Sequence, residues 1–170
     1  MMLKYDYQNS IGFAIKNTLK AFESLFDQQL RKTADISITQ SRVIGSLTLV
    51  KDGMTQKELA DRIGIEAPSI VPIIDRLEEQ KMVVRRPDPD DRRNNLIFLT
   101  DKSESKWELI VDCAVELESI SRQGVSEHEL EVTRKTLRKI TQNIAGFCET
   151  SSSPGHVKGK KGNDMIQAKK

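Results

Sequence analysis

The sequence predicts a mainly α-helical protein with one small β-wing, and three features of the chain lead to this fold class. Apolar residues recur every three or four positions near both ends of the chain, which is the spacing of one helix face. Two shorter helical segments separated by a glycine occupy residues 55–80. Directly after them, two β-branched and aromatic runs flank a polar loop, which predicts a hairpin. A helix-turn-helix followed by such a hairpin is a winged helix-turn-helix, here flanked by terminal helices.

The first helix is predicted from about Tyr5 to Lys32. One face of it carries the apolar stripe Ile11, Ile15, Leu19, Phe22, Phe26 and Leu30. Thr39 is positioned to cap a second helix. The apolar residues of that helix are Val43, Ile44, Leu47 and Val50. Gly53 is then the natural glycine to end it, because glycine tolerates the left-handed conformation that closes many helices.

The segment 55–80 has the internal spacing of a helix-turn-helix. Its first helix opens with TQKE, which has the form of a capping box, and Gly64 allows a tight turn after it. The second helix is apolar along Ile70, Ile74 and Leu77. Pro68 suits the first position of this helix, whereas Pro72 lies just past the first turn and removes one hydrogen bond. We therefore expect a continuous helix with a slight bend, although an ordinary helical hairpin would show the same pattern.

The wing and two further helices follow. MVVRR and NLIFLT are the predicted strands, and PDPDDRRN between them is a long polar tip. A helix after Thr100 carries Trp107, Ile110, Ala114 and Leu117. The last helix opens with the capping box SEHE and carries Leu130, Leu137, Ile140, Ile144 and Phe147.

Length and charge limit the classes of function. The chain has 170 residues, of which 31% are charged and 5% aromatic, as in a soluble helical protein. Its net charge is +2, and residues 151–170 contain five lysines and one aspartate, a net +4, which leaves −2 for residues 1–150. DNA binding by the folded part must therefore depend on local patches rather than bulk charge. Residues 151–170 have the composition of a disordered basic tail.

Several other classes of protein are excluded by the residues present. The sequence has no stretch of membrane-spanning length and no signal peptide, so a cytoplasmic chain without membrane association is expected. Two histidines and two cysteines offer neither a catalytic triad nor a metal-ligand cluster, so we expect no enzyme, no metal and no cofactor. Cys113 and Cys148 are interpreted as small apolar helix residues in a reduced protein. A thiol-based redox sensor remains the alternative interpretation for them.

The stretch MTQKELADRIGIEAPSIVPIIDRLEEQKMVVRRPDPDDRRNNLIFLT resembles the winged-helix core of the MarR (multiple antibiotic resistance regulator) family. Its most specific parts are IDRLEEQ ahead of the wing, and DRR at residues 91–93 followed by IFLT. The order of the flanking helices also fits, so the resemblance covers residues 5–148. It implies a homodimeric transcriptional regulator, with repression the expected role, that binds pseudo-palindromic double-stranded DNA. It also implies frequent release by a small anionic or aromatic effector, commonly a phenolic acid, or by oxidation.

The resemblance suggests a role for each candidate DNA-binding residue. The second helix of the helix-turn-helix is called the reader helix, because it is the one expected to enter the DNA groove. On the side opposite its apolar stripe it carries Pro68, Ser69, Pro72 and Arg76, and the first three are the candidates for the major groove. Ser41, Thr55 and Gln56 lie at helix starts, which suit phosphate contacts. Arg93 is assigned to the minor groove, with Arg92 and Asn94 on neighbouring phosphates. Many relatives carry Arg, Ser or Asn at position 72, so this chain lacks the usual hydrogen-bonding reader there.

The terminal helices are predicted to form a homodimer, because their apolar stripes are wider than a small winged helix can cover. The residues assigned to that interface are Ile11, Ile15, Leu19, Phe22, Leu137, Ile140, Ile144 and Phe147. The chain then divides into an N-terminal dimerisation helix, a DNA-binding domain, C-terminal dimerisation helices and the tail, at residues 1–38, 39–100, 101–150 and 151–170. A monomeric helical bundle is the alternative to the dimer. A winged helix that binds only protein is the alternative to DNA binding.

Overall fold

The structure is a computed structural model that describes residues 6–91 and 93–151. Arg92 and residues 152–170, which include nearly all of the predicted tail, lie outside the described residues. The chain divides into two compact units, Met1–Gln123 and Gly124–Lys170. Among the described residues, no helix combines the length and the apolar character needed to cross a membrane.

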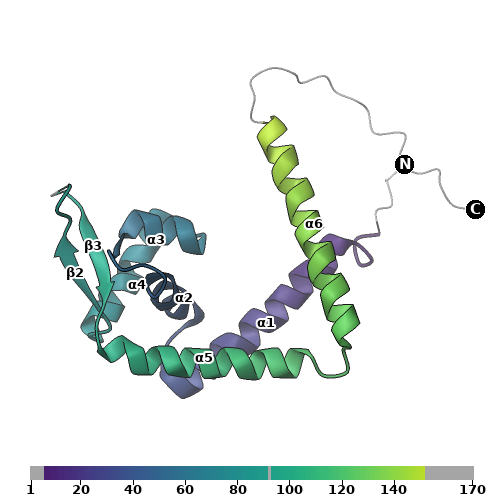
Figure 1. The fold of residues 1–170 in the computed structure, drawn as a ribbon, viewed down its shortest axis with the longest axis horizontal. Coiled ribbons are helices and arrows are strands. Elements are labelled where there is room, and N and C mark those ends of the chain that lie inside the picture. Colours follow the sequence, from purple (N-terminus) through teal and green to yellow (C-terminus); the bar gives the residue numbers. More distant parts are fainter. Residues whose placement is uncertain (1–5, 92, 152–170) are drawn as a thin grey trace, which may run out of the picture. The chain divides into compact units, whose positions relative to one another are not determined.

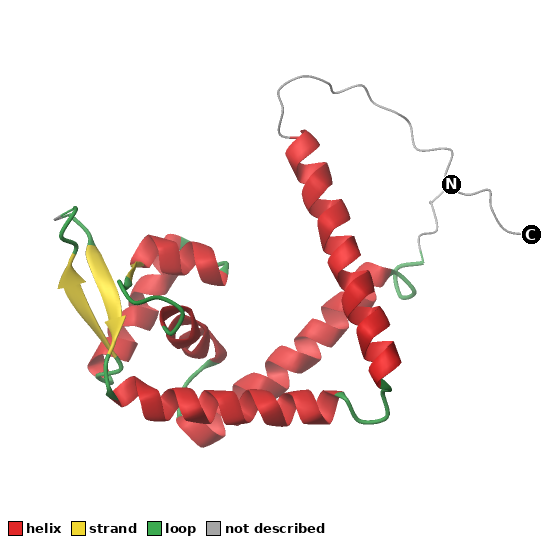
Figure 2. Cartoon of the chain, in the orientation of Figure 1, coloured by secondary structure: helices red, strands yellow, loops and turns green. Residues whose placement is uncertain are grey.

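The first unit contains five helices and three short strands within its described residues (Figures 1 and 2). In chain order these are α1 (Ile11–Ala34), α2 (Ile38–Leu47), β1 (Met54–Thr55), α3 (Gln56–Ile63), α4 (Ala67–Glu79), β2 (Val83–Pro87), β3 (Asn95–Leu99) and α5 (Lys102–Ser121). The described part of the second unit is built around α6 (Glu127–Ser151), which opens with the predicted Ser126–Glu129 capping box. The predicted fold class, mainly helical with a small wing, is confirmed.

The wing sheet has three antiparallel strands in the order β1-β3-β2. The predicted hairpin pairs Val83 with Leu99 at its base and Pro87 with Asn95 next to its tip. β1 adds Met54 opposite Ile97 and was not predicted, because a two-residue strand has no periodicity to detect. Through β1, the start of α3 is joined directly to the wing.

The core of the first unit lies where α1, α2, α3, α4, α5 and the sheet meet. Its fully buried large side chains include Leu30, Ile36, Ile44, Leu59, Ile70, Ile74, Leu77 and Ile97. The stripe predicted for the reader helix therefore faces inward as expected. Cys113 is also buried in this core, which agrees with its interpretation as a small apolar residue. Cys148 in α6 is exposed, which does not agree with the same interpretation.

The second helix begins earlier than predicted. Ser37, not Thr39, is its N-cap: the Ser37 hydroxyl accepts from the Gln40 N–H at 3.2 Å, and Gln40 Oε1 accepts from the Ser37 N–H at 2.9 Å. Asp27 accepts the Ile38 N–H at 2.8 Å, and its pKa is lowered by hydrogen bonds from Arg31 and from that N–H. These contacts fix the start of α2, and only part of them could be read from local sequence.

The same helix also ends earlier than predicted. It stops at Leu47 with Thr48 as its C-cap, so the assignment of Gly53 as the closing glycine is wrong. Gly53 has a positive φ of 73° and leads the chain into β1. A Cβ there would lie 2.8 Å from Phe98 Cζ and 2.9 Å from the Ile97 carbonyl oxygen. Glycine is therefore required at this position by the sheet, not by the helix.

The reader helix α4 is continuous through Pro72, as predicted. Ala67 is its first residue, so Pro68 occupies the second position rather than the first. The correction is small in energy, because the N–H groups of a helix's first turn have no partner within the helix.

Candidate nucleic-acid interface

The exposed face of α4 is formed by the residues predicted to read DNA. Thr55 caps α3 within the predicted capping box, and α3 ends at Gly64, whose φ is 75° and whose N–H donates to the Ala60 carbonyl at 2.9 Å. This tight turn lets the apolar sides of α3 and α4 pack together. The opposite side of α4 is exposed at Pro68, Ser69, Pro72 and Arg76. The structure thus brings these four predicted residues together on one surface.

At the wing tip, Arg93 forms a bidentate ion pair with Asp91. Its Nε and Nη2 each donate to the Asp91 carboxylate at 2.9 Å, and its backbone N–H donates to the same group at 3.1 Å. Asn94 adds a bond to Asp91 at 3.2 Å. The side-chain bond to Arg93 is the main reason that the pKa of Asp91 is lowered, so the pair stays charged at neutral pH. With 89% of its side chain exposed, Arg93 is oriented by Asp91 while its outer surface faces solvent.

The start of α3 faces the wing tip across a hollow of about 400 Å³. It is lined by Thr55, Gln56, Lys57, Ala67, Arg93, Asn94 and Asn95. Thr55 donates its backbone N–H and its hydroxyl to Glu58 Oε2, both at 2.8 Å. The donors needed for a phosphate contact at Thr55 are therefore used inside the capping box. Lys57 was missed by the sequence analysis, although a lysine in a helix's first turn beside a wing is a detectable signal.

Ser41 does not belong to this surface, so its assignment as a phosphate contact is wrong. It is 4% exposed, and its hydroxyl donates to the Ile38 carbonyl at 2.8 Å. The reason is the early start of α2, which places Ser41 one turn inside the helix on its core side rather than at the helix start.

The two arginines at the base of the wing lie on opposite faces of the sheet. The Arg85 guanidinium donates hydrogen bonds to Asp75 and Glu78 of α4, and the Arg85 backbone N–H donates to Glu78 at 3.2 Å. Burial lowers the pKa of Arg85, but these hydrogen bonds outweigh burial and the pKa is raised overall. The Arg86 guanidinium instead lies 4.9 Å from the centre of the Phe98 ring. Alternate residues of a strand point to opposite faces, which separates the two side chains.

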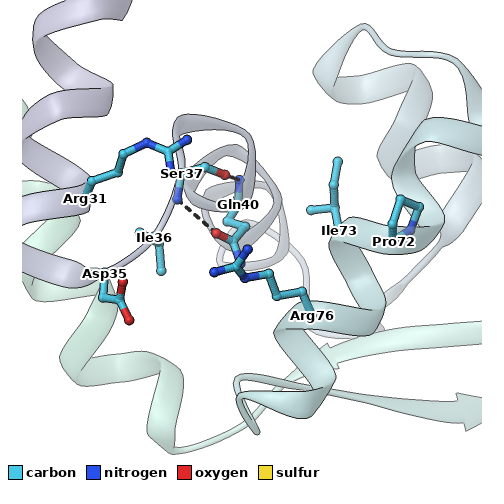
Figure 3. Close-up of a pocket in the computed structure, with 8 residues that line it drawn as sticks. All are labelled: Arg31, Asp35, Ile36, Ser37, Gln40, Pro72, Ile73 and Arg76. Atoms are coloured by element: carbon cyan, nitrogen blue, oxygen red, sulfur yellow. Dashed lines mark hydrogen bonds between the residues drawn. The ribbon is translucent and has the colours of Figure 1, made fainter.

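A second hollow, of about 290 Å³, lies between the end of α1, the start of α2 and the reader helix (Figure 3). Its lining residues are Arg31, Asp35, Ile36, Ser37, Gln40, Pro72, Ile73 and Arg76. In Figure 3 the Arg76 side chain extends from α4 toward Gln40 on α2. The pocket thus combines two cations with apolar side chains of the reader helix.

The fold is shared with solved transcriptional regulators. A MarR-family regulator from Rhodococcus sp. RHA1 superposes with a TM-score of 0.71 at 23% identity, covering 81% of this chain and 96% of its own. MepR of S. aureus, crystallised with DNA, gives 0.70 at 24% identity over 79% of this chain and 98% of its own. CouR from Rhodococcus jostii RHA1, bound to p-coumaroyl-CoA, gives 0.68 at 22% identity over 91% and 100%. At these identities the superpositions establish the fold.

The sequence itself adds the family. The profile of the MarR family matches residues 34–94, from the end of α1 to the wing tip. The chain belongs to the MarR family. The resemblance noted from the sequence is thereby confirmed, and the chain is a DNA-binding transcriptional regulator of the MarR family and not an enzyme.

Proposed function

We propose that this MarR-family chain is a homodimeric repressor that binds a pseudo-palindromic operator and is released by a small anionic or aromatic effector. The observation that carries the proposal is the joint presentation, by one compact unit, of an exposed reader face and an exposed, paired Arg93. MepR, which has the same fold, was crystallised with DNA. Such a surface fits a reader helix in the major groove with the wing beside it.

The DNA contacts are proposed from this geometry. Pro68, Ser69 and Pro72 would approach base edges, with Arg76 on the same exposed face. Arg93 would enter the minor groove, where negative potential is enhanced. Phosphate contacts fall to Gln56, Asn94 and Lys57, which line one hollow, rather than to Thr55. Arg92, which lies outside the described residues, keeps its proposed phosphate contact.

The dimer is proposed from apolar side chains that the single chain leaves exposed. On α1, Ile11 is 59% and Leu19 54% exposed, and on α6, Ile144 is 61% and Phe147 72% exposed. Ile15, Phe22 and Leu137 are also exposed, while Ile140 is partly buried. Helices of this length owe most of their stability to packing of an apolar face. A second copy would cover these faces in an isologous interface, with residues 1–38 and 101–150 as the dimerisation regions around the DNA-binding domain.

The pocket beside α4 is the proposed effector site. Arg76 supplies positive charge for a carboxylate or phosphate, and Pro72 and Ile73 supply apolar contact for an aromatic ring. Arg31 already pairs with Asp27 at 2.6 Å, and Asp35 adds a negative charge to the lining, so Arg76 is the main anion-binding group of the pocket. CouR was crystallised with p-coumaroyl-CoA, which combines an aromatic group with phosphates. Because Pro72 and Arg76 also belong to the proposed reader face, an effector here would compete with DNA.

The proposal is tested by selecting bound duplexes from a random pool, with and without p-coumarate or p-coumaroyl-CoA. We expect enrichment of a two-fold symmetric site and weaker enrichment with the effector present. Binding to random duplex should also fall steeply as salt rises, because phosphate contacts release counterions. A winged helix that binds only protein would show neither enrichment nor steep salt dependence. A redox sensor would respond to mild peroxide, which would reach the exposed Cys148 more readily than the buried Cys113.

Arg93→Ala is expected to weaken operator binding by roughly 10- to 100-fold, because a groove-inserted guanidinium is lost. Lys160→Ala, a change of one lysine in the basic tail, should instead lower the salt dependence by about one counterion. Fluorescence anisotropy at three or more salt concentrations separates the two effects. Equal small losses from both variants would mean that the wing tip is merely solvated.

Pro72→Arg is expected to change which bases are preferred near the centre of each half-site. Proline offers apolar contact to a thymine methyl group, whereas arginine donates two hydrogen bonds to guanine. The wild type should therefore depend largely on DNA shape and the wing, and the variant should gain base discrimination. The measurement is the random-pool selection repeated with the variant. Indistinguishable sites would show that this face of α4 does not approach the bases.

A further inference from the structure

We infer that Arg85 is a positioning residue that fixes the spacing between the reader helix and the wing, so that both grooves of DNA are contacted at once. The inference rests on the proposed DNA-binding mode. Arg85 itself is not assigned a DNA contact, because its guanidinium is directed at two carboxylates of α4 rather than at solvent.

The contacts of Arg85 connect two elements that carry different DNA contacts. Asp75 and Glu78 lie along one flank of α4, beside its reader face, while Arg85 lies in β2, three residues before the tip begins at Asp88. Only 20% of the Arg85 side chain is exposed, against 89% for Arg93. Arg85 is thus used inside the protein, whereas Arg93 is exposed to a partner.

The ion pairs of Arg85 with Asp75 and Glu78 are called the clamp, and their geometry explains why arginine is needed. One guanidinium nitrogen donates to Asp75 and another to Glu78, while Glu78 also accepts the Arg85 backbone N–H at 3.2 Å. The planar guanidinium can hold two carboxylates in a fixed orientation, whereas a lysine ammonium is a single flexible point charge. The clamp therefore restrains both the position of β2 along α4 and its rotation.

The functional consequence follows from effective concentration. Once the reader helix is bound, the wing contact is intramolecular, and its contribution depends on how often the wing occupies the correct position. If the clamp is loosened, Arg93 must be ordered during binding, and part of its contribution is lost. Removing Arg93 should then cost less in a protein without the clamp than in the wild type.

The chain offers a matched control in Arg86. It is the neighbouring cation of the same strand, but it lies over Phe98 on the other face and makes no part of the clamp. Arg85→Lys and Arg86→Lys both keep the charge, so a general electrostatic effect on DNA would be the same for the two variants.

The experiment is a double-mutant cycle on operator affinity, measured with the full chain at fixed salt. We expect Arg93→Ala to cost roughly 10- to 100-fold in the wild type and in Arg86→Lys, and at least about threefold less in Arg85→Lys. Arg85→Met is measured alongside, and its folded fraction is checked by circular dichroism. If Arg85→Met unfolds, the charge-conserving variant still decides the result, since coupling to Arg93 is not moved by a loss of stability alone.

Each other outcome has a defined meaning. An Arg93→Ala cost that is the same in the wild type, Arg85→Lys and Arg85→Met would overturn the positioning role while leaving the proposed function intact. If Arg93→Ala leaves the operator affinity of the wild type nearly unchanged, both the positioning role of Arg85 and the proposed DNA contact of the wing are overturned. Salt-independent binding of the wild type would overturn the proposed function itself.

Discussion

Ile144→Asp is expected to convert the proposed dimer into a monomer and to lower operator affinity by at least about 100-fold, because the two half-sites are no longer bound together. The carboxylate would be buried without a partner in the proposed interface, which costs several kcal/mol. A two-fold interface contains the substitution twice, so the cost is doubled. Leu137→Asp should act in the same way, since Leu137 lies two turns earlier on the same apolar face of α6.

Gln142→Asp is the matched control for this result. It introduces the same charge on the same helix, but position 142 lies nearly opposite Ile144 around a helix of 3.6 residues per turn. Multi-angle light scattering should show a dimer for the wild type and for Gln142→Asp, and a monomer for Ile144→Asp. A wild type that is a folded monomer at micromolar concentration would mean that the terminal helices fold back on their own chain instead.

Gly53→Ala is expected to destabilise the protein by about 2–5 kcal/mol. A left-handed backbone costs a non-glycine residue about 1–2 kcal/mol. The new Cβ would also lie 2.9 Å from the Ile97 carbonyl oxygen, which is fixed within β3, and 2.8 Å from Phe98 Cζ. Overpacking of this kind adds about 1–3 kcal/mol. Because β1 joins the start of α3 to the wing, the variant should also weaken DNA binding.

Gly64→Ala separates the two causes. Gly64 has nearly the same φ, 75° against 73°, but among the described residues nothing lies within 4 Å of its Cβ position. It should therefore lose only the conformational part, about 1–2 kcal/mol. Urea unfolding at one fixed protein concentration gives both values, since the stability of a dimer depends on concentration. Equal losses for the two glycines would show that the contact with β3 relaxes freely.

Several features of the interface could be predicted because they depend on residues close together in the chain. The stripe of Ile70, Ile74 and Leu77 follows the 3.6-residue period, so it determines which side of α4 is left exposed. The capping box at Thr55 and the turn at Gly64 depend on three or four neighbouring residues. The hairpin was detectable from two short β-branched runs around a polar loop.

Other predictions were wrong because the deciding contact is distant or depends on a shift of one or two residues. Ser37 and Thr39 are both suitable caps, and Gln40 and Asp27 together select Ser37, which moves Ser41 into the core. Gly53 was predicted to end the second helix, but the strand that requires a glycine there lies more than forty residues away. The sequence placed Thr55 at a helix start without showing that Glu58 takes both of its donors.

The sequence alone determined the family, the order of the elements and the exposed face of the reader helix, because periodicity and short motifs are local properties. Only the tertiary structure decided which cations of the wing are available to a partner. Arg85 and Arg93 are equivalent in charge, and each is next to another arginine in the sequence. Their difference arises because α4 presents Asp75 and Glu78 to β2, while Asp91 pairs with Arg93 within an exposed turn. Pairing between elements depends on three-dimensional register, which the order of residues does not specify.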